Sequence, residues 1–471
     1  MPTSDLRYDL RIRDLVHGFV YLTDLEKCTI NHPLFQRLRH IRQNDAAFFV
    51  YPSLNISRFE HSIGCVSVAG RMAANLVRSP AARKYLSYIG LNQKDFQQLC
   101  RLYALLHDVG HLPLSHLFET AFEDFAGRDR AIEPLVREWF GGEGFYKLHE
   151  ASGNVIAEAI LRDVKVDASL KKKLLRLMRE KKLGKSDPLR PVKLLIDSEI
   201  DADRIDATAR DGLLAGREYG TYDIDRLCSA VFLQEHEEGW RLAYSHKALG
   251  SIESLLLDRY RTHRWIHFHH RVVAMKAAIG ELITKLLRDG VIRKESFRVD
   301  EPKQMALRDD IWLWSLIRDH ASFKHNETLN AAYKFAIHRD KSGVMPLWKR
   351  RNAYSQWVTG CLRIAGLDKL PLEKLNRPYE EFLGSKLGFR AVCFHLRFTP
   401  VGAETVPLTT EGGEEDFESL RSSSALVSSL QEIWARDPQF YLLIFGQDSR
   451  NRKEISEECN RLTAQYLGTT R

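Results

Sequence analysis

The chain has 471 residues, 44% of them hydrophobic and 28% charged, which is typical of a globular protein of two or three domains. No run approaches the roughly 18 apolar residues of a membrane-spanning helix, and the polar N-terminus does not resemble a signal peptide. The cysteines form no CxxC pair, which argues against a disulfide framework or a zinc knuckle. A reducing cytoplasm is therefore expected, and the formal net charge of +8 favours polyanionic partners such as nucleotides or nucleic acid.

The first two thirds of the chain have mainly helical patterns. Residues 12–30 alternate and are rich in β-branched and aromatic residues, which predicts a short hairpin. Apolar residues then recur at three- and four-residue spacing, which predicts helices over 34–43, 65–77 and 96–108. Asn92 is the expected N-cap of the third helix.

A strongly basic amphipathic helix is predicted over 170–185, where the sequence is LKKKLLRLMREKKLGK. Two interpretations stay open: a solvated helix face, or a ridge that binds phosphate or nucleic acid. Strand patterns follow over 389–401 and 440–447, and the polar stretch 404–424 is expected to be a long loop.

These patterns predict a mostly α fold. We expect a helical domain with a small N-terminal hairpin over 1–295, followed by a smaller α+β region over 296–471 that serves regulation or oligomerisation.

Residues 102–118, LYALLHDVGHLPLSHLF, are apolar enough for a buried helix but contain His107, Asp108, His111 and His116. A buried imidazole or carboxylate costs free energy unless it is paired or binds a metal. Adjacent residues on a helix lie about 100° apart, so both members of a His-Asp pair can reach one cation at the helix flank. Nitrogen and carboxylate oxygen together suit Fe, Mn, Mg or Zn.

Further ligands must come from elsewhere in the chain. His61 lies in NISRFEHSIG, with Arg58 three residues before it. The stretch SEIDADRIDATARDG carries several acids within a helical pattern: Asp201, Asp203, Asp206 and Asp211. Spacing alone does not decide which of these acids is a ligand.

Four ordered blocks, FQRLRHIRQ, YPSLNISRFEHSIG, ALLHDVGHLPLSHLFE and EIDADRIDATARDG, resemble the HD-domain deoxynucleoside triphosphate triphosphohydrolases, which include bacterial dGTPases. The likeness covers roughly residues 9–290. It implies one or two divalent ions (Mn, Mg, Fe or Zn) held by His61, His107, Asp108 and Asp203. It implies catalytic or supporting roles for His111, for the dyad of His116 and Glu119, and for the pair His149 and Glu150. It implies substrate contacts at Gln43, Asn44, Arg58, Arg204, Asp211 and His270.

The resemblance also implies a reaction. Water activated by the metal would attack the α-phosphorus of a dNTP, and His116 would protonate the leaving 5′ oxygen, which releases deoxynucleoside and triphosphate. Relatives further imply an even-numbered homo-oligomer, a nucleotide activator and a role in antiviral dNTP depletion. Two alternatives remain: an HD phosphohydrolase acting on another nucleotide or on single-stranded nucleic-acid ends, and a non-catalytic nucleotide sensor.

Three positions depart from the family pattern. Asn44 replaces a leucine that packs on the sugar, and Ala207 and Phe268 replace tyrosines. The departures predict weaker selection for deoxyribose. His263, His267 and His270 are spaced to share a helix face, where a helix packing beneath the nucleotide pocket is favoured over a second metal site.

Overall fold

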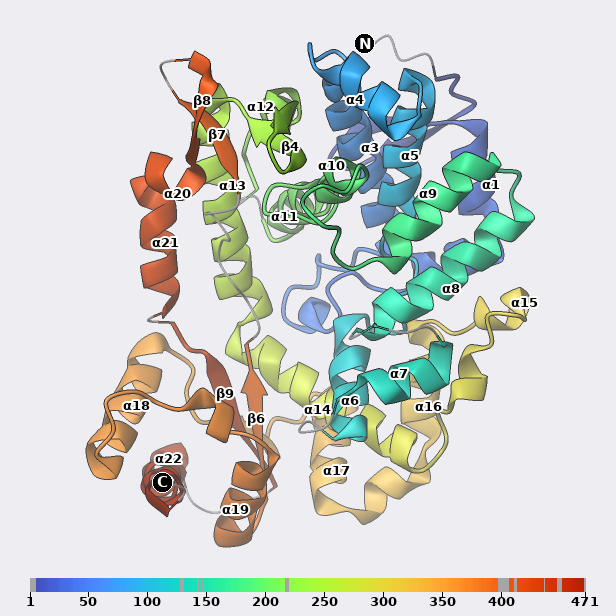
Figure 1. Ribbon diagram of the computed structural model, residues 1–471. Helices are drawn as coiled ribbons and strands as arrows, with labels where there is room; N and C mark the ends of the chain where they lie inside the picture. Colours follow the sequence, from blue (N-terminus) through green and yellow to red (C-terminus); the bar gives the residue numbers. More distant parts are fainter. Residues whose placement is uncertain are drawn as a thin grey trace.

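The computed structural model describes residues 6–127, 131–141, 144–145, 147–216, 220–396, 406–410, 413–435, 437–446 and 451–469. Helices dominate these residues, and the strands form three small sheets (Figure 1). This agrees with the predicted mostly α fold. Among the described helices, none is both long and apolar enough to cross a membrane.

The predicted N-terminal hairpin is present but ends at residue 22, and the prediction was wrong for 24–30, which are helical because a capping box starts a helix there. Strands β1 (Leu10–Asp14) and β2 (Gly18–Leu22) pair antiparallel. Helix α1 (Asp24–Asn31) follows behind a capping box made by Thr23 and Glu26.

The expected helix over 34–43 is instead short and broken. Helix α2 (Pro33–Gln36) passes into a 3-10 turn (Arg37–His40), and the chain is extended at Ile41. Arg42 then forms a β-bridge with Ser57. A tertiary contact therefore ends a helix that the local apolar pattern would have continued.

Two long helices form the centre of the N-terminal part. Helix α3 (Arg58–Leu76) begins with a capping box, and α5 (Gln93–Leu106) is capped by Asn92, as predicted. They pack along each other, with α4 (Ala82–Ile89) between them in sequence. Because α5 is buried from Phe96 onward, its C-terminal end delivers residues 107–108 into the interior.

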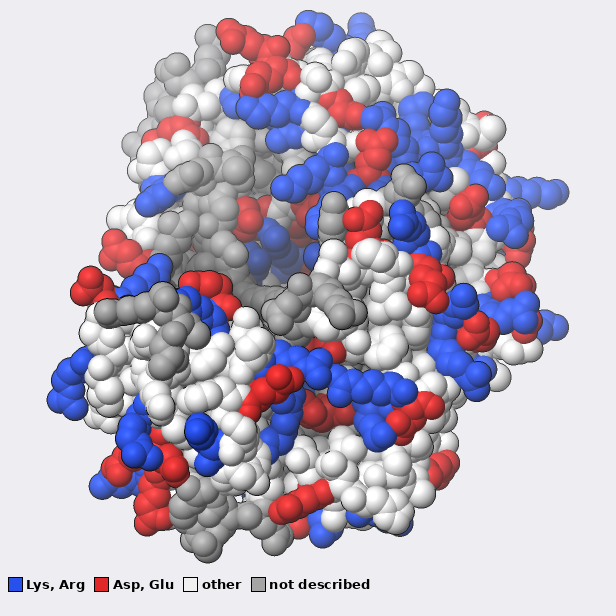
Figure 2. Space-filling view, turned by 60° about the horizontal axis from the view of Figure 1, so that its bottom comes forward, with Lys and Arg blue, Asp and Glu red and all other residues white. Residues whose placement is uncertain are grey.

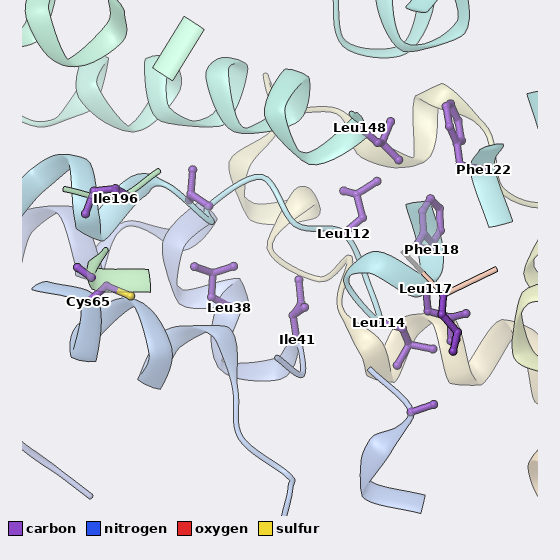
Figure 3. Close-up of a cluster of buried hydrophobic side chains, with 14 of the residues drawn as sticks. Leu38, Ile41, Cys65, Leu112, Leu114, Leu117, Phe118, Phe122, Leu148 and Ile196 are labelled. Carbon is purple, nitrogen blue, oxygen red and sulfur yellow. The ribbon is translucent and has the colours of Figure 1, made fainter. Parts of the chain in front are cut away.

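Five helices follow these two along the chain. They are α6 (His116–Ala126), α7 (Glu133–Phe140), α8 (Leu148–Asp163), α9 (Ala168–Arg179) and α10 (Arg190–Leu194). The basic helix predicted over 170–185 is therefore helical only as far as Arg179. Figure 3 shows apolar side chains of the turn before α6 and of α6 itself, together with Leu148, gathered in the core.

Helix α11 (Ala202–Leu214) crosses α3, and α12 (Ile224–Ala230) leads to the antiparallel strands β3 (Val231–His236) and β4 (Gly239–Tyr244). Helix α13 (Leu249–Thr262) continues into a π-helical turn (His263–His267). Helix α14 (His270–Arg288) begins only after a break. The three histidines predicted to share one helix face therefore do not lie on one continuous helix.

The C-terminal region has two parts. Helix α15 (Pro302–Met305) packs against α2, whereas α16 (Asp310–Asp319) and α17 (Glu327–Tyr333) lie beside α14 in the lower right part of Figure 1. Strands β5 (Val344–Pro346), β9 (Phe440–Phe445) and β6 (Arg390–His395) form an antiparallel sheet in that order, with α18 (Arg351–Ala365), α19 (Arg377–Leu387) and α22 (Arg452–Thr469) around it. Strands β6 and β9 confirm both strand predictions, although 397–401 and 447 lie outside the described residues.

The expected long loop over 404–424 was wrong for the part that the structure describes. It contains β7 (Pro407–Thr410), β8 (Gly413–Ser419) and α20 (Leu420–Ser423), followed by α21 (Ala425–Ala435). Strand β7 pairs with β4 and extends that sheet to the order β3-β4-β7-β8. Pairing with a strand more than 160 residues away stabilises a segment whose polar composition predicts a loop. The C-terminal region thus returns to the helical domain, and a domain boundary near 295 remains a prediction.

Candidate active site

Four predicted ligands converge where α3, α5 and α11 meet. The Nε2 atom of His61 lies 3.0 Å from Oδ1 of Asp203 and 3.6 Å from Oδ2 of Asp108. The Nε2 atom of His107 lies 3.6 Å from Oδ1 of Asp108 and 4.0 Å from Oδ1 of Asp203. Residues far apart in sequence therefore present nitrogen and carboxylate oxygen to one point.

The donor set fits a divalent cation. The Nδ1 atom of His107 is 2.6 Å from the carbonyl oxygen of Ala104, whereas its buried Nε2 has no hydrogen-bond partner among the described residues. Burial lowers the pKa of His61, but the surrounding thiol and carboxylates outweigh burial and raise it well above its usual range. The cluster thus favours positive charge, and imidazole with carboxylate suits Mn, Fe or Zn.

Asp206 orients His61 from behind. Its Oδ2 lies 2.8 Å from Nδ1 of His61, and its Oδ1 lies 2.7 Å from Nε2 of the buried His17 in the hairpin. Arg210 donates to both oxygens. A Cβ at position 64 would come within 1.8 Å of Asp206 Oδ1, so Gly64 is what allows this close approach. A carboxylate behind a ligating histidine fixes its tautomer.

Asp206 and Cys65 have places in the site that were not predicted from the sequence. The Sγ atom of Cys65, one helical turn after His61, lies 3.5 Å from His61 Nε2, and burial raises the pKa of the thiol. The i, i+4 spacing from His61 was the available sequence signal for Cys65. For Asp206, the signal was its position three residues after Asp203, which places both acids on one side of the helix.

Asp201 and Asp203, which spacing could not separate, have different positions. Asp201 is the N-cap of α11 and accepts hydrogen bonds from the backbone N–H groups of Ser198 and Arg204. Burial raises the pKa of Asp201 to about 7. Only Asp203 of this pair lies in the cluster with His61.

A second cluster lies next to the first. The Nδ1 atoms of His116 and His149 lie 2.8 Å and 2.6 Å from the two oxygens of Glu119. The ring of His111 stacks on that of His149, with centroids 4.3 Å apart, and its Nε2 lies 3.3 Å from Oδ1 of Asp108. Burial raises the pKa of Glu119, but His149 and His116 outweigh it and lower the pKa well below its usual range. An ionised carboxylate therefore lies between two imidazoles.

Residues 58–211 match the HD domain family. The chain contains an HD domain. An uncharacterized protein of Methanocaldococcus jannaschii is 27% identical over 308 residues, which are 65% of this chain and 54% of that protein. The deoxynucleoside triphosphate triphosphohydrolase SAMHD1 homolog of Dictyostelium discoideum is 25% identical over 339 residues, 67% of this chain and 55% of that protein. The chain spans about half the length of the curated relatives it matches.

Two solved structures share the fold over nearly the whole chain. A hypothetical protein from Aquifex aeolicus has a TM-score of 0.64 at 20% identity and covers 96% of this chain and 99% of its own. A phosphohydrolase from Bacteroides thetaiotaomicron has a TM-score of 0.65 at 18% identity and covers 93% of this chain and 100% of its own. The likeness therefore extends beyond the HD domain into the C-terminal region.

The residues predicted to contact substrate do not gather at one point as the predicted metal ligands do. Asn44 Nδ2 donates to Asp211 Oδ1 at 2.6 Å, and Asp211 Oδ2 lies 3.0 Å from His267 Nε2. Gln43 has a buried side-chain oxygen without a hydrogen-bond partner in the described part of the chain. Of the three histidines at 263–270, the one that contacts Asp211 is thus His267, which was not predicted to bind substrate.

His270 lies elsewhere, in a cavity of about 140 Å³ with five other basic residues. These are Arg271, Arg339, Lys341, Lys349 and Arg452. Burial lowers the pKa of His270 to about 4. Nothing acidic lines this cavity among the described residues, so it is electrostatically suited to an anion.

The two predicted phosphate-binding arginines are engaged with protein groups. Arg58 is buried and pairs with Asp108, and its Nε donates to Ser115 Oγ at 2.9 Å. Arg204 lies 3.1 Å from Glu199 and also donates to a backbone carbonyl. A phosphate that bound either guanidinium would have to share its N–H groups with these protein partners.

A cavity of about 170 Å³ opens beside the predicted metal ligands. Its lining includes His107, Asp108, Asp203 and Glu150, whose Oε2 is buried with no hydrogen-bond partner among the residues that the structure describes. Basic side chains line it as well: Lys147, Arg179, Lys181 and Lys193. Asp197 adds a fourth carboxylate to this lining, so the cavity is mixed in charge. On the face in Figure 2, Lys and Arg are likewise mixed with Asp and Glu over most of the surface. The cavity of His270, with no acid among its described lining residues, therefore gives the better support for anion binding.

Proposed function

We propose that the chain is a metal-dependent phosphohydrolase that converts a dNTP to deoxynucleoside and triphosphate. The convergence of His61, His107, Asp108 and Asp203 beside the Glu119-bridged histidines carries the proposal. The relative named as a dNTP triphosphohydrolase supports the substrate class.

The four ligands would hold the ion, which when bound polarises phosphoryl oxygen and acidifies water. His116 is the proposed proton donor. Its Nδ1 is engaged by Glu119, so Nε2 is the atom that would protonate the leaving 5′ oxygen. The side chain of His116 is 60% exposed, which leaves it accessible to a substrate.

The nucleoside would lie toward Asn44, Asp211 and His267. These three side chains form a hydrogen-bonded row within the helical part of the chain. Carboxylate and amide groups can bind sugar hydroxyls.

Regulation is proposed at the basic cavity that contains His270. Its five Lys and Arg side chains and its apolar wall suit a nucleotide, whose phosphates need cations and whose base needs apolar contact. We further propose an even-numbered homo-oligomer, which sedimentation velocity with and without nucleotides would test.

One observation favours a second candidate function, hydrolysis at the end of a single-stranded nucleic acid. Arg179, the last residue of the basic helix α9, and Lys181 line the cavity that also contains metal ligands. A backbone phosphate bound there would lie near the ion.

A product screen tests both candidates. All dNTPs, all NTPs and a single-stranded DNA would be incubated with Mn, Mg, Fe or Zn, and products separated by chromatography. Deoxynucleoside plus triphosphate supports the proposal, and phosphate or mononucleotides support an alternative substrate. The absence of turnover with every metal contradicts both and favours a nucleotide sensor.

A further inference from the structure

Asp310 in α16 reaches the candidate active site from outside the HD domain. It is fully buried, and its Oδ1 accepts a hydrogen bond from the backbone N–H of Leu114 at 2.7 Å. Its Oδ2 accepts from the backbone N–H of Arg42 at 3.0 Å and lies 3.3 Å from the Arg42 guanidinium. One carboxylate thus holds two segments together, one preceding His116 and one preceding Gln43.

The segment before His116 needs such support. Leu114 and Ser115 have φ values of 56° and 52°, in the left-handed region that non-glycine residues rarely adopt. Such a conformation persists only where its surroundings hold it. Ser115 is held as well, because its Oγ donates to the carbonyl of Arg42 at 2.8 Å and accepts from Arg58. Helix α6 begins at His116, directly after this turn, so the turn carries the residue whose imidazole is in question.

Ordinary helix capping does not explain Asp310. The preceding residue, Asp309, is the N-cap of α16 and accepts from the backbone N–H of Trp312 at 3.0 Å. Burial raises the pKa of Asp310 to about 6, so an ionised carboxylate at this position is unfavourable by itself. A side chain needed only for packing would be apolar, because buried charge destabilises unless its partners compensate.

We propose that Asp310 is a positioning residue that fixes His116 relative to the metal ligands, so that the C-terminal region completes the active site. The catalytic part of this inference rests on the proposed role of His116 as proton donor. The clamp itself does not depend on which phosphate ester is the substrate.

The test compares Asp310→Ala with Asp309→Ala. Both variants lose a carboxylate from the start of α16, and both carboxylates interact electrostatically with Arg37, so these shared effects cancel. Only Asp310→Ala releases the turn. Asp310→Asn keeps one acceptor oxygen and should give an intermediate effect.

Two measurements separate positioning from general damage. Amide hydrogen exchange of peptides covering 110–118 should rise by at least about tenfold in Asp310→Ala and by much less in Asp309→Ala, because opening of the turn is local. Turnover of a dNTP, whose alkoxide leaving group needs a proton, should fall about 10- to 100-fold in Asp310→Ala. Hydrolysis of bis(p-nitrophenyl) phosphate, whose leaving group needs no proton, should fall less than about threefold.

Unchanged exchange in Asp310→Ala would overturn the proposal, whatever the substrate. Equal losses with both esters, or equal losses in both variants, would reduce Asp310 to a structural role and also overturn it. Wild-type protein that hydrolyses the p-nitrophenyl ester but no dNTP would contradict the proposed substrate only. Raised exchange in Asp310→Ala would still support the clamp in that case.

Discussion

The candidate metal cluster and the proposed nucleoside side of the site are built differently. His61, the predicted ligand that α3 supplies, has its ring fixed from behind by Asp206, which is in turn held by Arg210 and His17. On the nucleoside side, Asn44 and Asp211 contact each other directly, with His267 reaching them from a π-helical turn. In the first region, buried hydrogen-bonded residues hold the donor atoms in place. The second region depends on direct contacts between side chains from separate elements. Substitutions in the first should therefore abolish chemistry, and those in the second should shift selectivity.

The largest effect is expected from removing two ligands. His107→Ala combined with Asp108→Ala should abolish both metal binding and turnover. The melting temperature should fall as well, because binding free energy stabilises the folded state. Elemental analysis of the purified variant checks this. Full metal occupancy would remove the site assignment altogether.

His116→Ala should keep the metal and slow hydrolysis by about 10²- to 10⁴-fold, the usual contribution of a positioned proton donor. Single-turnover kinetics on metal-loaded protein would measure the chemical step. An unchanged rate would transfer the acid role to His111 or His149, which belong to the same cluster.

Asp206→Asn tests the support behind the ligands. We expect metal affinity to fall about 10- to 100-fold, because the tautomer and orientation of His61 are no longer fixed. The matched control is Asp201→Asn, in the N-cap of the same helix, which retains an acceptor oxygen for the cap. Competition titration with a metal indicator measures both, and equal affinity in the two variants would show that Asp206 does not tune the site.

The smallest effect is expected on the nucleoside side. Asn44→Leu removes the donor and acceptor that could satisfy a 2′-hydroxyl, so the dNTP-to-NTP ratio of kcat/KM should rise about tenfold. Activity on the preferred dNTP should change less than this ratio. A wild-type protein that already rejects NTPs by more than about a thousandfold would contradict the idea that Asn44 faces the sugar.

The four residues that the resemblance implies as ligands lie together in the structure, and their role as metal ligands stays a prediction. His-Asp at the end of an apolar helix is costly without a compensating partner, so the residue types alone indicate a cation. Capping of α5 by Asn92 and the strands β6 and β9 follow from local patterns in the same way.

Contacts between distant segments limited the other predictions. The polar stretch that becomes β7 is a strand because it pairs with β4. The local sequence of the stretch gives no indication of this distant partner. Likewise, His270 and His267 differ in surroundings because the helix breaks at 268–269, a break that their i, i+3 spacing does not reveal.

By itself, the sequence indicated most of the element types, since periodicity is a local property, and the resemblance of its ordered blocks implied the donor residues and a metal-dependent phosphohydrolase. Only the tertiary structure showed that Asp203, which the resemblance had implied, lies with the other three residues, and that Asp206 supports His61 from behind. It also decided that Asp310, about 200 residues after His116, lies against the turn that presents this histidine. The physical reason is that hydrogen bonds and burial act through space, so the partners of a buried polar group are fixed only when the chain has packed.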